Sequence, residues 1–73
     1  MFMYKIFEVN ERMCDIDLFR IERSNLNIKE FSDKFFNEMK NDDSELCGVF
    51  EYDEYVDVII NEEESYEVYK VEM

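Results

Sequence analysis

Hydrophobic residues recur along the chain at two different spacings, and these spacings predict the secondary structure. Between residues 28 and 40 the apolar side chains lie three or four positions apart, as on an amphipathic helix. Short runs of β-branched, aromatic and aliphatic residues on either side predict strands. The predicted strands cover residues 3–9 and 16–22 before the helix, and 46–52, 55–60 and 66–71 after it. We therefore expect the order ββαβββ.

The predicted helix has a start signal and one apolar stripe. Asn27 and Glu30 have the spacing of a capping box, with Asn27 as the N-cap and Glu30 as its N3 partner. The apolar stripe consists of Ile28, Phe31, Phe35 and Met39, with Phe36 at its flank. Packing this stripe on one face of an antiparallel sheet gives the economical core for so short a chain. We expect a single α+β domain over residues 1–73, with a sheet of about five strands and one helix.

The charge of the chain lies almost entirely in its second half. Residues 42–73 contain twelve carboxylates and one cation, Lys70, a net charge of −11. Residues 1–41 contain eight acidic and seven basic side chains. Such a field repels nucleic acid and anionic membranes, and it attracts basic surfaces. The expected partner is a cationic protein surface, and we expect no direct binding of nucleic acid or membrane.

The acidic residues of the second half fall into three groups, and they define the predicted partner-binding site. The groups are Asp42, Asp43 and Glu45 after the helix; Glu51, Asp53, Glu54 and Asp57 around the middle hairpin; and Glu62, Glu63, Glu64 and Glu67 around the last hairpin. Residues two apart on a strand face the same side at about 6.6 Å. Glu51 with Asp53, or carboxylates on neighbouring strands, are therefore expected to form a regular anionic array. Such an array resembles the phosphates of a nucleic acid. Four tyrosines are interleaved with these acids: Tyr52, Tyr55, Tyr66 and Tyr69. Tyrosine is a favoured interface anchor, and Tyr52 and Tyr55 are included in the predicted site.

Residues that carry catalysis are few. The chain has no histidine, no serine or cysteine in a nucleophile motif and no glycine-rich phosphate loop. A calcium loop can be drawn from Asp43 to Glu54, but Cys47 occupies a ligand position and residues 49–52 are predicted as a strand. We therefore expect neither enzymatic activity nor a metal or other cofactor.

The two cysteines and the N-terminus give no targeting or metal signal. Cys14 and Cys47 have no metal-binding spacing, and we expect both to be small buried or half-buried hydrophobic residues in a reducing compartment. The N-terminus lacks a basic region before an apolar run, and no apolar stretch is long enough to span a bilayer. The expected location is the cytoplasm of the host cell.

In its small size, acidity and expected compact α+β domain, the chain resembles small acidic DNA-mimic inhibitors. This class includes phage-encoded anti-CRISPR proteins, anti-restriction proteins and uracil-DNA glycosylase inhibitors. The residues that carry the resemblance are the carboxylates around 51–55 and 62–64. The resemblance implies a protein that occupies the DNA- or RNA-binding groove of an enzyme, such as a host-defence nuclease, and blocks nucleic-acid binding.

Several alternatives stay open at this stage. The same charge suits an immunity protein or antitoxin that binds a basic toxin, or an acidic adaptor in a regulatory complex. The acidic residues can also be ordinary solvated surface. An exposed edge strand, such as residues 3–9 or 66–71, would allow a partner to extend the sheet. A homodimer is a further alternative.

Overall fold

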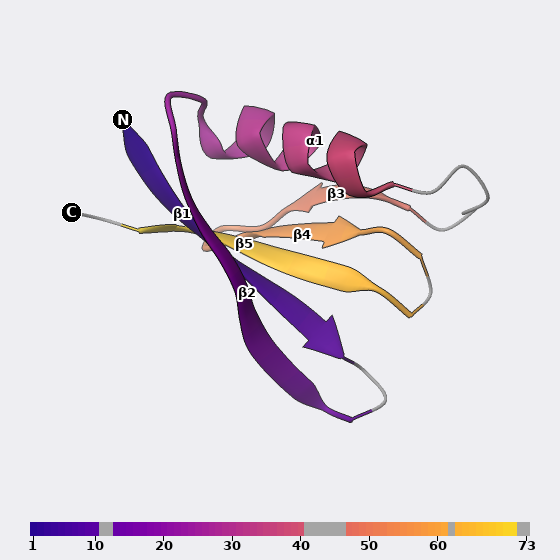
Figure 1. Cartoon of the computed structure of the whole chain (residues 1–73). Coiled ribbons are helices and arrows are strands. Elements are labelled where there is room, and N and C mark those ends of the chain that lie inside the picture. Colours follow the sequence, from indigo (N-terminus) through magenta and orange to yellow (C-terminus); the bar gives the residue numbers. More distant parts are fainter. Residues whose placement is uncertain (11–12, 41–46, 62, 72–73) are drawn as a thin grey trace.

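The computed structural model describes residues 1–10, 13–40, 47–61 and 63–71. Within these residues the chain forms five strands and one helix, and the helix lies over one face of the sheet (Figure 1). The elements are β1 (Phe2–Asn10), β2 (Asp15–Ser24), α1 (Ile28–Met39), β3 (Gly48–Glu51), β4 (Val56–Ile59) and β5 (Ser65–Val71). All strand pairs are antiparallel, in the order β2-β1-β5-β4-β3. The predicted α+β class and the order ββαβββ are confirmed.

The core lies between α1 and the sheet face that α1 covers. The buried hydrophobic side chains are Tyr4, Ile6, Phe31, Phe35, Val56, Val58, Ile60, Tyr66 and Val68. Full burial of side chains of this size contributes about 1.5–3 kcal/mol each. Aromatic contacts join helix and sheet, because Phe31 stacks on Tyr4 at 4.4 Å and Phe35 meets the ring of Tyr66 edge-on at 5.1 Å. The apolar stripe predicted for the helix therefore packs on the sheet: Phe31 and Phe35 are buried in the core, and the other members of the stripe are partly buried against it.

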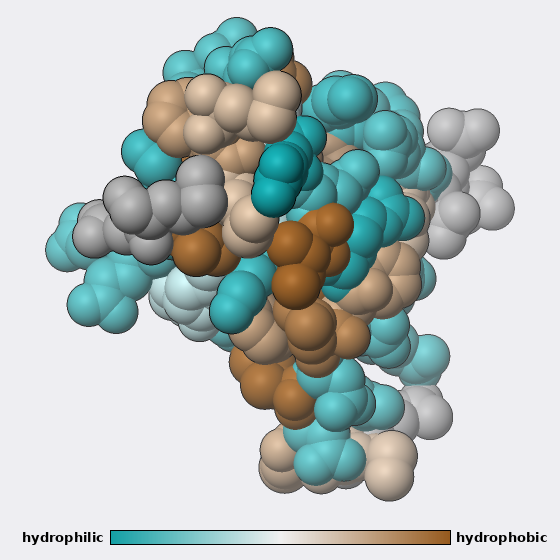
Figure 2. Space-filling model, turned by 60° about the vertical axis from the view of Figure 1, so that its left-hand side comes forward, coloured by the Kyte–Doolittle hydropathy of each residue, from teal (hydrophilic) through white to brown (hydrophobic). Residues whose placement is uncertain are grey.

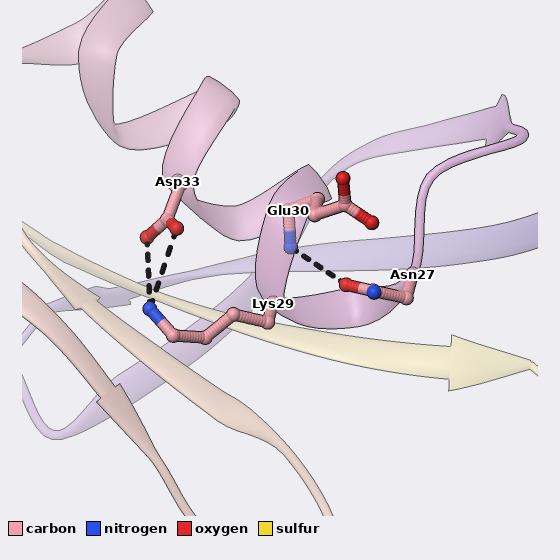
Figure 3. A network of polar contacts seen from close by, with 4 residues as sticks. All are labelled: Asn27, Lys29, Glu30 and Asp33. Carbon is pink, nitrogen blue, oxygen red and sulfur yellow. Dashed lines mark hydrogen bonds and ion pairs between the residues drawn. The ribbon is translucent and has the colours of Figure 1, made fainter.

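The helix begins as its sequence predicts. Asn27 Oδ1 accepts a hydrogen bond from the Glu30 backbone N–H at 2.9 Å, and Lys29 Nζ lies 3.3 Å from an Asp33 carboxylate oxygen (Figure 3). The N-cap bond satisfies one of the backbone donors that a helix start leaves unpaired. Just before the cap, the Tyr4 hydroxyl donates to the Leu26 carbonyl at 2.6 Å, which ties the β2–α1 connection to the sheet.

The strand order places the strands of the acidic second half of the sequence on one side of the sheet. β5 pairs with β1, so β3, β4 and β5 form one side of the sheet, while β2 and β1 form the other. The acidic second half of the chain thus lies beside a first half that is close to neutral. The same order corrects an expectation, because the strands predicted at 3–9 and 66–71 are β1 and β5, which lie inside the sheet. Both are paired on two sides, and the edges are β2 and β3.

Candidate partner-binding surface

The sheet face opposite α1 is covered by no other described element, and an aromatic row crosses it. Tyr52 stacks on Tyr55 with ring centroids 5.1 Å apart, and Tyr55 stacks on Tyr69 at 5.3 Å. The rings of Tyr69 and Phe7 then meet at nearly a right angle, with centroids 5.5 Å apart. These four residues extend from the end of β3 to β1, so the row joins the acidic side of the sheet to the neutral side.

Two carboxylates lie beside this row. Asp57 on β4 and Glu67 on β5 are direct cross-strand partners, and both belong to the open face. The Tyr69 hydroxyl donates to Glu67 Oε1 at 2.6 Å. This bond, together with partial burial, raises the pKa of Tyr69 to about 12. Burial and the nearby carboxylates of Glu67 and Asp57 also raise the pKa of Tyr55. Both tyrosines therefore stay neutral under physiological conditions, so each keeps a hydroxyl proton that can be donated.

The hairpin between β3 and β4 forms an acidic hollow at one end of the row. The hollow has a volume of about 460 Å³, and it is lined by Ile28, Glu51, Tyr52, Asp53, Glu54, Tyr55, Val56 and Lys70. Lys70 is the cation of this group, and its Nζ lies 4.3 Å from the centre of the Phe2 ring. Three acids of the predicted middle group, Glu51, Asp53 and Glu54, thus line one concave region.

The detailed spacing predicted for two of these acids is wrong. Glu51 is the last residue of β3, whereas Asp53 and Glu54 form a two-residue turn, closed by a hydrogen bond from the Tyr52 N–H to the Tyr55 carbonyl at 2.9 Å. Glu51 and Asp53 therefore do not repeat along one strand. Carboxylates on neighbouring strands, the other arrangement expected from the sequence, do occur in register: Asp57 on β4 pairs with Glu67 on β5.

The last acidic group lies at the other end of β4. Glu63 is exposed in the β4–β5 turn, and Glu64 accepts a hydrogen bond from the Tyr66 hydroxyl at 2.6 Å. Four residues of strand separate this turn from the β3–β4 turn, a distance of about 13 Å at the usual rise of a strand. Tyr66 itself is buried in the core and presents no ring to a partner. The predicted residues Asp42, Asp43, Glu45 and Glu62 lie outside the described residues.

Sequence reasoning missed part of the open face. Tyr69 and Phe7 complete the aromatic row. Tyr69 is one of the tyrosines interleaved with the acids but was not included in the predicted site, and Phe7 was not considered as a site residue. The edge strand β2 adds three half-exposed apolar side chains, Ile16, Leu18 and Ile21. Ile16 and Leu18 alternate with Asp15 and Asp17, which was a signal for an apolar face on this strand.

Cys14 and Cys47 are both exposed, so the expectation that they are buried or half-buried is wrong. Cys14 lies in the β1–β2 turn with a left-handed backbone (φ 55°), a position in a tight turn that faces solvent. In the part of the chain that the structure describes, no three potential metal-ligating side chains lie together, and no helix could cross a membrane.

When compared with known proteins, the chain matches no family model, no curated protein and no solved structure.

Proposed function

We propose that the protein is an acidic nucleic-acid mimic, an inhibitor that fills the cationic groove with which another protein binds DNA or RNA. By the resemblance noted for the sequence, the owner of the groove is a host-defence nuclease such as a CRISPR effector. The inhibitor blocks access of nucleic acid by occupying the same basic side chains.

The observation that carries the proposal is a pair of carboxylates beside a stack of tyrosine rings. Tyr52, Tyr55 and Tyr69 stack in succession, and the Asp57–Glu67 pair lies beside them. A nucleic-acid strand has the same two components, stacked aromatic bases and regularly placed negative charge. A protein groove that binds such a strand offers aromatic side chains and cations. The tyrosine rings of this protein can stack on the former, and its carboxylates can pair with the latter.

Exposed aromatic side chains favour a protein partner. Tyr52 is 55% exposed and Phe50 is 48% exposed, and both lie at the β3 edge among the acids. Large aromatic groups contribute most to affinity where they enter a pocket on a partner, while charges at the rim mainly speed the encounter. The β3–β4 hairpin combines both features.

The first test identifies the partner and locates the surface. The protein is used as bait in a host-cell lysate, beside a variant with Glu51→Gln, Asp53→Asn and Glu54→Gln. A control bait carries Glu30→Gln, Asp33→Asn and Glu38→Gln on the helix, so that both variants lose three charges. Nucleic-acid-binding proteins retained by the wild type and the control, but lost with the hairpin variant, support the proposal. Equal losses with both folded variants would contradict it.

The second test asks whether the inhibitor and nucleic acid compete. Labelled DNA or RNA bound to the captured protein is titrated with the inhibitor at several salt concentrations. Complete displacement, with an inhibitor affinity that falls steeply as salt rises, is expected because the contact depends on screened charges. A stable ternary complex with full nucleic-acid affinity would reject mimicry. That outcome would favour the immunity-protein alternative, in which a basic toxin is bound away from its nucleic-acid site.

A further inference from the structure

An apolar strip occupies the neutral side of the open face. Ile16, Leu18 and Ile21 on β2 are 51%, 52% and 49% exposed. Leu18 lies opposite Phe7 on β1, and Ile16 lies opposite Val9, so strand pairing brings the apolar side chains of both strands together. Figure 2 shows hydrophobic residues gathered in a strip that runs down this side of the molecule, toward the end where the β1–β2 hairpin lies. We define the apolar strip as Phe7, Val9, Ile16, Leu18 and Ile21.

A β-bulge in β2 determines which side chains of this strand belong to the apolar strip. The register of β1 with β2 shifts between Ile6 and Phe7, and Phe19 is the extra residue on β2. Phe19 turns to the helix side, where its ring lies 5.0 Å from that of Tyr66. Leu18 and Ile21 therefore share the open face although they are three positions apart. Two strip residues, Phe7 and Ile16, also line a groove of about 390 Å³, whose other lining residues are Lys5, Tyr69, Lys70 and Val71.

We propose that this strip binds a second copy of the chain, and that the protein forms a weak two-fold dimer through the open faces of β1 and β2. The distribution of charge favours a second copy as the occupant. Residues 1–24 have five acidic and four basic side chains, whereas residues 42–73 have a net charge of −11. Two copies can approach each other through the first region with little repulsion, but not through the second. A basic partner, in contrast, is drawn to the acidic side.

The strand order allows such a dimer to keep its acidic sides apart. A two-fold axis parallel to β1 and β2 places β2 of each copy over β1 of the other, as in face-to-face packing of sheets. β3, β4 and β5 then extend in opposite directions from the axis, because they lie beyond β1 in the sheet. Each copy thus keeps the Tyr52–Asp57 region free for the partner proposed above.

The size of the apolar strip determines how tightly we expect the dimer to associate. Two strands of nine and ten residues are about 30 Å long, so the shared area is at the lower end of specific interfaces. We therefore expect dissociation in the micromolar range. Because residual repulsion between two chains of charge −12 is screened by salt while apolar contact is not, the dimer should strengthen as salt rises. Binding of the cationic partner should change in the opposite direction.

The test is sedimentation equilibrium of the purified chain alone, from low to high micromolar concentration and at low and high salt. We expect a monomer–dimer equilibrium that Leu18→Glu weakens about tenfold or more, equivalent to about 1.4 kcal/mol. Ile21→Ser is the milder second variant, in case the first does not fold. Phe50→Glu is the matched control, because Phe50 is 48% exposed on the same face but at the acidic edge.

Three outcomes would overturn the dimer. The first is a wild type that stays monomeric at every concentration and salt level. The second is a dimer that Leu18→Glu and Ile21→Ser leave intact, and the third is one that Phe50→Glu weakens as much. None of these results depends on the nucleic-acid-binding partner, so the dimer and the mimicry can fail separately.

Discussion

Asp57 and Glu67 lie directly opposite each other on β4 and β5, and both carboxylates belong to the sheet face that the helix leaves uncovered. Like charges in this position usually destabilise a sheet, and cross-strand pairs are worth about 0.2–1 kcal/mol. The strands nevertheless hold these two acids in register at the centre of the acidic side. A cationic side chain of a partner could contact both carboxylates at once, which is the physical reason to connect the pair with binding.

The first prediction is that Asp57→Lys stabilises the free protein and weakens the complex. A lysine at this position faces Glu67, so the free energy of unfolding should rise by roughly 0.5–1 kcal/mol. Chemical denaturation measures this change. Glu54→Lys, in the exposed β3–β4 turn, changes the net charge equally without creating the cross-strand pair and should have the smaller effect on stability. A loss of stability in Asp57→Lys would show that repulsion between Asp57 and Glu67 does not destabilise the wild-type protein.

The second prediction concerns Tyr69 at high pH. Its pKa is raised from 10.0 to about 12, so between these values the unfolded chain releases this proton before the folded chain does. The unfolded state thus binds fewer protons, and stability should fall as pH rises from 10 to about 12. Tyr69→Phe should reduce this fall. Glu67→Gln should keep the tyrosine but bring its pKa closer to 10, because the carboxylate that accepts its hydrogen bond is lost.

Unfolding curves across this pH range, together with absorbance titration of the tyrosines, provide the measurement. A Tyr69→Phe variant that loses as much stability as the wild type over the same range would assign the high-pH transition to other tyrosines.

The helix and the strands could be predicted because each carries a local pattern. Asn27 and the stripe from Ile28 to Met39 specify a capped amphipathic helix whatever the rest of the chain does. The order of the strands in the sheet has no such local pattern, because it depends on pairing between segments that are far apart in the sequence. No local feature of residues 66–71 indicates that β5 pairs with β1 and thereby becomes an interior strand.

The candidate site was predictable in composition and not in geometry. The acids and tyrosines of residues 51–57 were evident from the sequence, yet the Asp57–Glu67 pair depends on the register of β4 with β5. The apolar strip was hidden for a related reason. The bulge at Phe19 shifts the alternation of β2, so Leu18 and Ile21 reach one face at a spacing that a regular strand does not give.

The third prediction is that Ser32→Ala stabilises the protein. Ser32 is fully buried in α1, and its hydroxyl makes no hydrogen bond with the described residues. A buried hydroxyl without a partner carries a desolvation cost, and alanine is also the better helix former. The expected gain in the free energy of unfolding is about 1 kcal/mol. Ser24→Ala is the contrasting control, since the Ser24 hydroxyl accepts a hydrogen bond from the Leu26 N–H at 3.1 Å and its removal should destabilise the chain.

The last prediction separates the roles of rings and charges in the complex with the captured partner. Tyr52 and Tyr55 stack on each other at the tip of the acidic hairpin, and Tyr52 is more than half exposed. If their rings enter the groove of the partner, Tyr52→Ala should mainly increase the dissociation rate, because buried aromatic anchors control the lifetime of an interface. Glu63→Gln, at the other end of β4, should mainly slow association, because a charge at the periphery steers the encounter.

Association and dissociation rates measured at two salt concentrations distinguish these effects. The slower association of Glu63→Gln should approach the wild-type rate at high salt, where steering is screened, while the faster dissociation of Tyr52→Ala should persist. If Tyr52→Ala leaves the dissociation rate unchanged while the charge variants abolish binding, the rings serve only to support the hairpin. Recognition would then rest on the carboxylates alone.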